Sequence, residues 1–192
     1  QQPDVIGRFT QLLANEIAYE VTGNTTFKNN VQTIVGDLIY HQNGANGQLP
    51  ANRVDGGLYH IGEQHDASEV DDPNVLIASA WMSGMIVDPL VRVFGVWQNA
   101  QISEFMVRMG NFVKVASKTD DNGQFGGTLR YPDYLMRADG ATENRTDTDV
   151  QHAMDVGAVA AWATYFAELR GTPDASLRQL ANDLYATYDV GV

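Results

Sequence analysis

The hydrophobic positions of the chain form three similar stripes, and each stripe has the spacing of one buried helix face. The intervals i, i+4, i+7 and i+8 place apolar side chains on one side of an α-helix. The three stripes lie 78 and then 72 positions apart, which predicts a repeat of about 75 residues. The stripes are Phe27, Val31, Ile34, Val35 and Leu38; Phe105, Met109, Phe112, Val113 and Ala116; and Leu177, Ala181, Leu184, Tyr185 and Tyr188.

Each stripe follows the end of another apolar segment. Glu20-Val21-Thr22-Gly23 matches Glu168-Leu169-Arg170-Gly171, and glycine commonly ends helices in the left-handed conformation. Asn24 or Thr25 then caps the next helix, as Asp174 does after Pro173, while the segment 95–99 takes this place in the middle repeat. We predict six helices, with a kink or break at Pro89. Their approximate ranges are 5–22 with 25–41, 74–97 with 101–118, and 149–170 with 174–188.

The predicted fold is therefore all-α: one helical-repeat domain, 1–192, of three tandem hairpins, with repeats at about 5–72, 73–148 and 149–192. Two long connections, about 42–72 and 120–148, separate the hairpins. Each contains an Asn-Gly turn signal, at Asn46-Gly47 and Asn122-Gly123, and several aromatic and apolar residues. Connections of this length are usually functional or disordered, and these apolar residues favour ordered loops with short extended pieces.

Composition narrows the classes of partner. The chain has 192 residues, 44% hydrophobic and 19% charged, which is a globular composition. Its net charge of −12 disfavours binding to nucleic acid, and no apolar run is long enough to span a membrane. Cysteine is absent, which excludes disulfides and thiolate sites. The start at Gln1 without a signal peptide, together with the scarcity of lysine, favours a processed secreted or periplasmic protein.

The first connection carries the densest chemistry. Tyr59, His60 and His65 lie within a few positions of one another, next to Glu63 and Asp66. Histidine titrates near neutral pH and serves as acid, base or metal ligand, so we take Tyr59, His60 and His65 as candidate catalytic residues. The alternative is a surface loop whose histidines form local hydrogen bonds.

A metal site at this loop would combine its histidines with nearby carboxylates. His65 and Glu69 form an H-x-x-x-E spacing, with His60 upstream and Asp66 between them. This spacing matches no zinc motif closely. We therefore predict no metal and no cofactor.

The second connection carries rings and positive charge. Tyr131 and Tyr134 offer surfaces on which sugars stack, and Arg130 and Arg137 could clamp a carboxylate. The alternative is internal pairing of these arginines with neighbouring acids. Further candidates lie on the predicted helices: His152 near the start of the fifth helix as a catalytic group, and Trp97 near a helix end as a ligand contact. We interpret Trp81 and Trp162 as core residues.

Hairpins joined by long loops, with the matching Glu20-x-x-Gly23 and Glu168-x-x-Gly171 segments, resemble the alpha/alpha toroid enzymes, which include many glycoside hydrolases and polysaccharide lyases. The resemblance is one of architecture. It implies that the first helix of each hairpin belongs to an inner ring and the second to an outer ring. It also implies a substrate cleft formed by the loops that lead into the inner helices. A full toroid needs about six hairpins, so a missing segment or a second chain would complete the ring.

We accordingly expect a carbohydrate-processing domain or fragment. A lyase would use a tyrosine or histidine as base and an arginine for the uronate. A hydrolase would use two carboxylates, for which Glu63, Asp66 and Asp155 are candidates. The alternative is a non-catalytic helical-repeat module that binds glycan or protein. The enzyme hypothesis requires that His60, His65, Tyr134, Arg137 and His152 converge on one cleft.

Overall fold

The part of the chain that the structure describes is mostly helical, with 64% of those residues in helices and 9% in strands. This computed structural model describes residues 5–44, 53–120, 129–141, 143 and 150–191. The helices are α1 Val5–Thr22, α2 Thr25–Gln42, α3 Ala80–Gly84, α4 Val87–Trp97, α5 Ala100–Val115, α6 Ala153–Leu169 and α7 Ala175–Gly191, with a 3-10 turn η1 at Gly62–Gln64. The strands are β1 His60–Ile61, β2 Leu76–Ala78, β3 Ser117–Asp120, β4 Leu129–Pro132 and β5 Met136–Arg137.

The predicted helix ends are confirmed at the first and third hairpins. Gly23 and Gly171 both adopt positive φ, +65° and +74°, as left-handed terminators. Asn24 then caps α2, because its side chain accepts a hydrogen bond from the Thr26 amide at 2.9 Å. Asp174 accepts in the same way from the amide of Ser176 at 2.8 Å. The sequence signals at these turns therefore form as capping geometry.

The middle hairpin uses the same turn with different residues. Gln98, with φ +47°, takes the left-handed position that glycine holds in the other two hairpins. Asn99 follows it and accepts a hydrogen bond from the Gln101 amide at 2.9 Å. A non-glycine residue pays a steric cost at this φ, which explains why the turn signal is weaker here in the sequence.

The predicted helix over 74–97 is wrong in its first part and is split. Its first residues form the strand β2, and the break between α3 and α4 lies at Met85 and Ile86. Pro89 sits in the first turn of α4, where a backbone N–H has no partner within the helix and its loss costs little. Two other boundaries also differ: the helix predicted over 101–118 ends at Val115, and the one predicted from 149 begins at Ala153.

The two connections contain the short extended pieces that were predicted. β1, β2 and β5 form one antiparallel sheet, in the order β1-β2-β5, with His60 opposite Ile77 and Ile77 opposite Arg137. β3 and β4 form a second antiparallel pair. The Asn-Gly turns that the sequence predicts, Asn46-Gly47 and Asn122-Gly123, lie outside the described residues.

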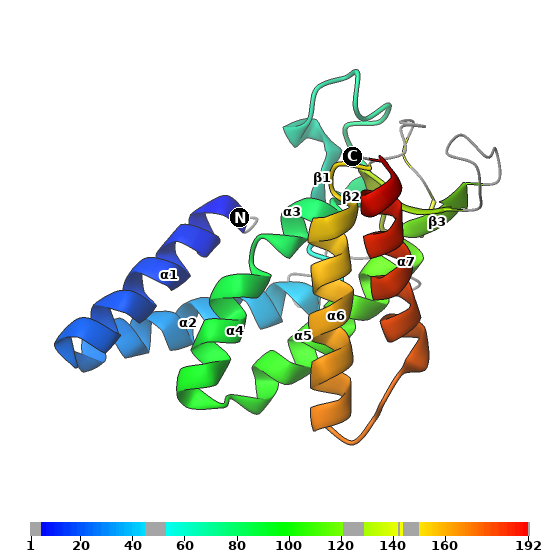
Figure 1. Cartoon of the computed structure of the whole chain (residues 1–192). Helices are drawn as coiled ribbons and strands as arrows, with labels where there is room; N and C mark the ends of the chain where they lie inside the picture. Colours follow the sequence, from blue (N-terminus) through cyan, green and yellow to red (C-terminus); the bar gives the residue numbers. More distant parts are fainter. Residues whose placement is uncertain (1–4, 45–52, 121–128, 142, 144–149, 192) are drawn as a thin grey trace.

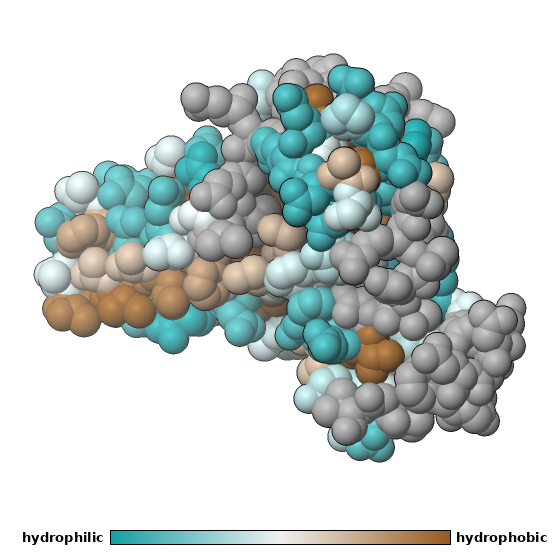
Figure 2. Space-filling model, turned by 90° about the horizontal axis from the view of Figure 1, so that it is seen from above, coloured by the Kyte–Doolittle hydropathy of each residue, from teal (hydrophilic) through white to brown (hydrophobic). Residues whose placement is uncertain are grey.

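The helices are arranged in two sets. The first helices of the hairpins contact one another, α1 with α3 and α4, and α3 with α6. The second helices do likewise, α2 with α5 and α5 with α7. Figure 1 shows the α1–α2 hairpin projecting to one side, while α6 lies between α5 and α7 at the other. Figure 2 shows hydrophobic side chains exposed along this hairpin, to which α1 contributes Ile17 and Val21.

The predicted stripes form part of the core. All five residues of the middle stripe are buried, as are Val31, Ile34, Val35 and Leu38 of the first. In the third stripe Leu177 and Leu184 are buried, whereas Tyr185 is 58% exposed and Leu180 is buried in its place. The buried face of α7 therefore follows i, i+3, i+7 spacing, because α7 presents a narrow seam to its neighbours.

Close approach of two helices fixes the centre of the core. A Cβ added at Gly110 in α5 would lie 2.3 Å from the Cβ of Ala163 in α6. Only a glycine fits this crossing, and α6 offers mostly small residues to α5 and α7. Within the described ranges, no helix combines the length and the hydrophobicity that crossing a lipid bilayer requires.

Candidate functional site

Tyr59, a candidate catalytic residue, lies in the core. Its side chain is 1% exposed, and its ring packs edge-on against Phe112 at 5.9 Å between ring centroids. The hydroxyl donates a hydrogen bond to the Val54 carbonyl at 2.8 Å. Burial raises the pKa of this phenol well above its usual range. These contacts suit an anchor for the loop and give the hydroxyl no access to a ligand.

His60 and His65, the other two candidates from this loop, bind to each other. Their rings stack with centroids 5.0 Å apart, and their Nε2 atoms lie 2.8 Å from each other. His65 Nδ1 lies 3.0 Å from the Glu69 carboxylate. We call His60, His65 and Glu69 the histidine cluster. It is a closed chain of hydrogen bonds in which each ring nitrogen of His65 has a protein partner.

The partners of the histidine cluster determine where its protons lie. Glu69 only accepts, so His65 Nδ1 must donate to it. The His60 ring donates to the carbonyl of Leu58, which leaves Nε2 of His60 as the acceptor of its contact with His65. The contact between His65 and Glu69 is mostly shielded from solvent, with side chains 12% and 23% exposed.

Burial lowers the pKa values of two histidines in this region, His60 and His41. Burial, followed by the charge of His65, lowers the pKa of His60 to about 4, against the opposing hydrogen bond to Leu58. His41, buried in α2, donates from Nε2 to the Tyr59 carbonyl at 2.7 Å, and burial also lowers its pKa. Among the described residues, no three His, Cys, Asp or Glu side chains are grouped so that they could hold a metal ion.

The two arginines of the second connection contact neighbouring protein groups. Arg130 donates to the carbonyls of Lys114 and Ser117, at 3.1 and 3.2 Å, where α5 ends. Arg137 lies 3.6 Å from the Asp139 carboxylate and 4.0 Å from that of Glu143. Arg137 therefore matches the alternative of pairing with neighbouring acids, whereas Arg130 binds backbone carbonyls instead.

Two aromatic candidates also serve packing. Tyr131 in β4 is buried. Trp97 lies at the end of α4, with its ring 5.2 Å from that of Tyr19 and with the Lys28 ammonium 5.9 Å from its centroid. Trp97 therefore joins α4 to α1 and α2, and it does not line the cleft described next.

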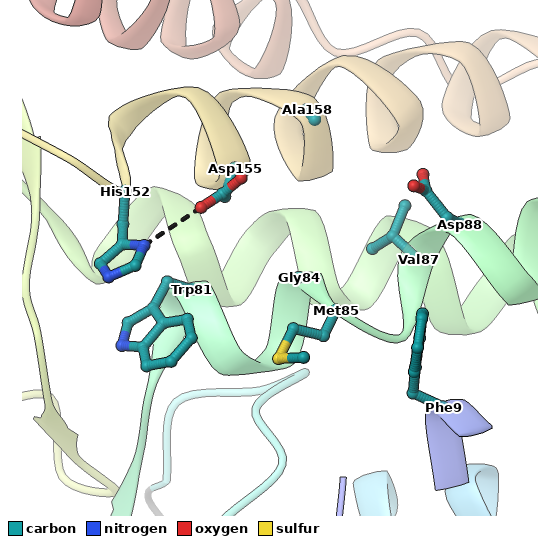
Figure 3. A pocket seen from close by; sticks show the side chains of 9 residues that line it. All are labelled: Phe9, Trp81, Gly84, Met85, Val87, Asp88, His152, Asp155 and Ala158. Carbon is teal, nitrogen blue, oxygen red and sulfur yellow. Dashed lines mark hydrogen bonds and ion pairs between the residues drawn. The ribbon is translucent and has the colours of Figure 1, made fainter. Parts of the chain in front are cut away.

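His152 is the candidate that borders a cleft. The cleft has a volume of about 360 Å³ and lies among α1, α3, α4 and α6 (Figure 3). The His152 ring stacks on Trp81, with centroids 4.2 Å apart and planes 9° from parallel. His152 Nδ1 donates to the Asp155 carboxylate at 3.1 Å. The lining residues are Phe9, Trp81, Gly84, Met85, Val87, Asp88, His152, Asp155 and Ala158.

Local sequence signals hold this cleft in shape. Ser79 starts α3 by accepting a hydrogen bond from the Met82 amide at 3.3 Å, which fixes Trp81 in the first turn. Gly84 lets α3 approach α6, since a Cβ there would lie 3.2 Å from a methyl group of Val159. The ring of Tyr134, another candidate, lies near the ring of Trp81, and the two ring centroids are 6.4 Å apart. Trp81 thus contacts the second connection through Tyr134 and the start of α6 through His152.

The charge of the lining is acidic. Asp88 and Asp155 both border the cleft, and none of the lining residues is lysine or arginine. The nearest arginine along α4 is Arg92, one turn beyond Asp88. Its guanidinium pairs instead with the carboxylates of Glu16, at 3.2 Å, and Glu20, at 3.6 Å, on α1. The cleft therefore carries two carboxylates and one histidine as its ionisable groups.

The convergence that the enzyme hypothesis required does not occur. The structure brings His152 and Tyr134 together at Trp81, while Arg137 lines a separate depression and His60 and His65 close on each other. Glu63 lies in η1, outside the cleft lining. The sequence analysis assigned Trp81 to the core, against which it does pack, but missed that its ring also lines the cleft, and it did not single out Asp88. The serine that precedes Trp81 at a helix start was the available signal.

No protein-family model, curated protein or solved structure matches the chain. The functional argument therefore rests on the cleft itself: a tryptophan, a histidine–aspartate pair and a second carboxylate around one concave site.

Proposed function

We propose that the cleft binds a ring of a carbohydrate and that the chain is a carbohydrate-binding helical domain. The observation that carries the proposal is the partly buried Trp81 ring, which lines a cleft that also offers carboxylates. The apolar faces of sugar rings pack on aromatic rings, while their hydroxyls donate to carboxylates and accept from imidazole. A volume of about 360 Å³ suits a small ligand or one or two sugar units.

The origin of the lining residues supports a toroid-like arrangement as part of this proposal. Every lining residue comes from the first helix of a hairpin or the turn before it: Phe9 from α1, Trp81 and Asp88 from α3 and α4, and His152 and Asp155 from α6. None comes from α2, α5 or α7. An inner layer of first helices around the ligand is what the resemblance to alpha/alpha toroid enzymes implies.

Two carboxylates at one cleft favour hydrolysis over elimination as the reaction, if the bound sugar is cleaved. Glycoside hydrolysis needs a carboxylic acid and a carboxylate on either side of the bond, and Asp88 and Asp155 are the candidates that the cleft supplies. Uronate elimination needs a positive group to neutralise the sugar carboxylate. Because Arg130 and Arg137 lie elsewhere with protein partners, the lyase form of the proposal lacks that group.

Replacement of Trp81 tests the proposal. Isothermal calorimetry with a panel of tetrasaccharides should detect binding to the unaltered chain, and Trp81→Leu should weaken it at least tenfold, about 1.4 kcal/mol. Trp97→Leu is the matched control, since Trp97 is partly buried on α4 outside the cleft and should leave binding unchanged. Circular dichroism of both variants checks their fold. If no tetrasaccharide binds, or if both variants lose binding equally, the proposal is wrong.

A second assay separates binding from catalysis. Tetrasaccharides that bind are incubated with the unaltered chain, and release of new reducing ends is measured. Asp88→Asn and Asp155→Asn should each abolish release if the pair cleaves the bond. Binding without any release would assign the chain to non-catalytic recognition.

A further inference from the structure

The charge of the cleft points to a particular class of sugar, an inference that rests on the proposed function. The lining combines an aromatic ring and several apolar side chains with two carboxylates. An aromatic face and a carboxylate are the two groups that attract an organic cation, the first through the ring quadrupole and the second through its charge. A neutral sugar would use only the hydrogen-bonding capacity of these acids.

The two carboxylates differ in how they are engaged. Asp155 accepts a hydrogen bond from His152 at 3.1 Å, and its side chain is 60% exposed, so an oxygen remains accessible to a ligand. Asp88 is exposed in the first turn of α4, and within the described part of the chain no basic group lies within ion-pair distance of it. Figure 3 shows Asp155 beside His152 on the Trp81 side of the cleft, and Asp88 at the other end, beyond Met85 and Val87.

The surroundings do not neutralise this charge. Arg92, the basic residue next along α4, is held by Glu16, which is itself buried, and by Glu20. Arg8 on α1, adjacent to Phe9 in the sequence, pairs with Asp37 of α2 at 3.1 Å. Both arginines therefore belong to pairs between helices. The whole chain, at −12, adds a field of the same sign as the two carboxylates.

We infer that the cleft is selective for basic sugars, that is, for glycans with free amino groups such as glucosamine oligomers. The ammonium group of such a sugar pairs with one of the two carboxylates, Asp155 or Asp88, while its ring packs against Trp81. Uronates are disfavoured, because their carboxylate would meet two like charges and no lysine or arginine in the lining. N-acetylated and hydroxyl-bearing sugars bind through stacking and hydrogen bonds alone.

Calorimetry with four tetrasaccharides tests this selectivity: a glucosamine oligomer, its N-acetylated form, a neutral glucose oligomer and a uronate oligomer. At pH 5.5 and low salt, the glucosamine oligomer should bind at least tenfold more tightly than the two neutral ones, and the uronate should not bind measurably. The advantage should shrink as salt is added, because the selective contribution is one of exposed charges.

Matched variants connect the selectivity to the cleft. Asp88→Asn and Asp155→Asn should each weaken glucosamine binding about fivefold and weaken binding of the N-acetylated form by a smaller factor. Asp189→Asn, which removes the same charge from an exposed site on α7, should change neither. Equal affinity for basic and neutral oligomers, or a preference for the uronate, would overturn the inference and leave the proposed function standing. Failure of all four to bind would overturn both.

Discussion

The histidine cluster and the cleft are two sites of similar composition with opposite character. In both, a histidine lies against an aromatic ring or a second imidazole and hydrogen-bonds through Nδ1 to a carboxylate three or four residues further along the chain. At His65 the second ring nitrogen is occupied by His60, and the Glu69 side chain is 23% exposed. At His152 the ring faces a cleft, and the Asp155 side chain is 60% exposed.

This difference shows why a cluster of reactive residue types in a sequence does not by itself indicate a functional site. The donors and acceptors of the histidine cluster form hydrogen bonds with one another. These hydrogen bonds therefore contribute to the structure of the loop. The cleft contains fewer ionisable groups, yet its aspartates are available to a ligand. A candidate site differs from a structural cluster because its polar groups are accessible and can still form hydrogen bonds with a ligand.

Acid should break the histidine cluster first. The pKa of His60 is about 4 in the folded protein against 6.5 for an unperturbed histidine. The unfolded chain therefore binds the proton more readily, so stability is full above pH 6.5 and falls as the pH drops toward 4. The loss amounts to about 3 kcal/mol at 1.36 kcal/mol per pKa unit. The lowered pKa of His41 adds a loss in the same direction.

Urea unfolding at half-unit steps between pH 7.5 and 4 measures this loss. The control is His60→Gln, which should flatten the profile in this window while the contribution of His41 persists. A wild-type curve that stays level down to pH 4.5 would contradict the assignment of His60 as a buried neutral acceptor.

Removal of one histidine from each region sharpens the comparison. His60→Ala leaves the His65 donor without an acceptor in a shielded place and should destabilise the fold by about 2 kcal/mol at pH 7. His152→Ala removes a ring that borders solvent and should cost less than about 1 kcal/mol. Denaturant midpoints of the two variants give both values. Equal losses would show that the cleft histidine is as structural as its counterpart.

The carboxylates should show the same contrast with smaller effects. Glu69→Gln weakens the shielded hydrogen-bond acceptor of His65 and should cost about 1 kcal/mol. Asp155→Asn changes an exposed acceptor and should cost about 0.3 kcal/mol. Proton NMR of the histidine ring N–H groups should show that Glu69→Gln moves the signal of the His65 Nδ1 proton. A Glu69→Gln variant as stable as the wild type, with an unchanged His65 signal, would contradict this role of Glu69.

The sequence predicts the helical hairpins well because their signals are local. Gly23 and Gly171 end helices, Asn24 and Asp174 begin them, and each signal depends on residues within one turn. The split of the third predicted helix is harder to predict, since Leu76 to Ala78 are apolar enough for either helix or strand. Their pairing with Met136 and Arg137, about 60 positions away, decides the outcome.

The candidate site was predicted less well, because it depends on tertiary contacts. His152 was identified from its residue type, whereas Trp81 has the spacing of a core residue and reaches the cleft wall only through the turn at Ser79. The loop histidines were misleading for a related reason. Nothing in the order of residues 59–69 shows that His60 and His65 face each other rather than a ligand.

The cleft takes its walls from all three repeats, and this has a consequence for the order in which the molecule assembles. Phe9, Trp81 and His152 lie 72 and 71 positions apart, so the ring-lined pocket is missing until α6 has been synthesised. Each hairpin forms from local contacts, and docking of α1, α3 and α6 requires the closure of long loops. During synthesis the half-finished chain exposes Trp81 and Met85 to solvent. The cleft is therefore complete only when the third hairpin is complete. A ligand that binds the cleft at that point would favour the docked arrangement of α1, α3 and α6.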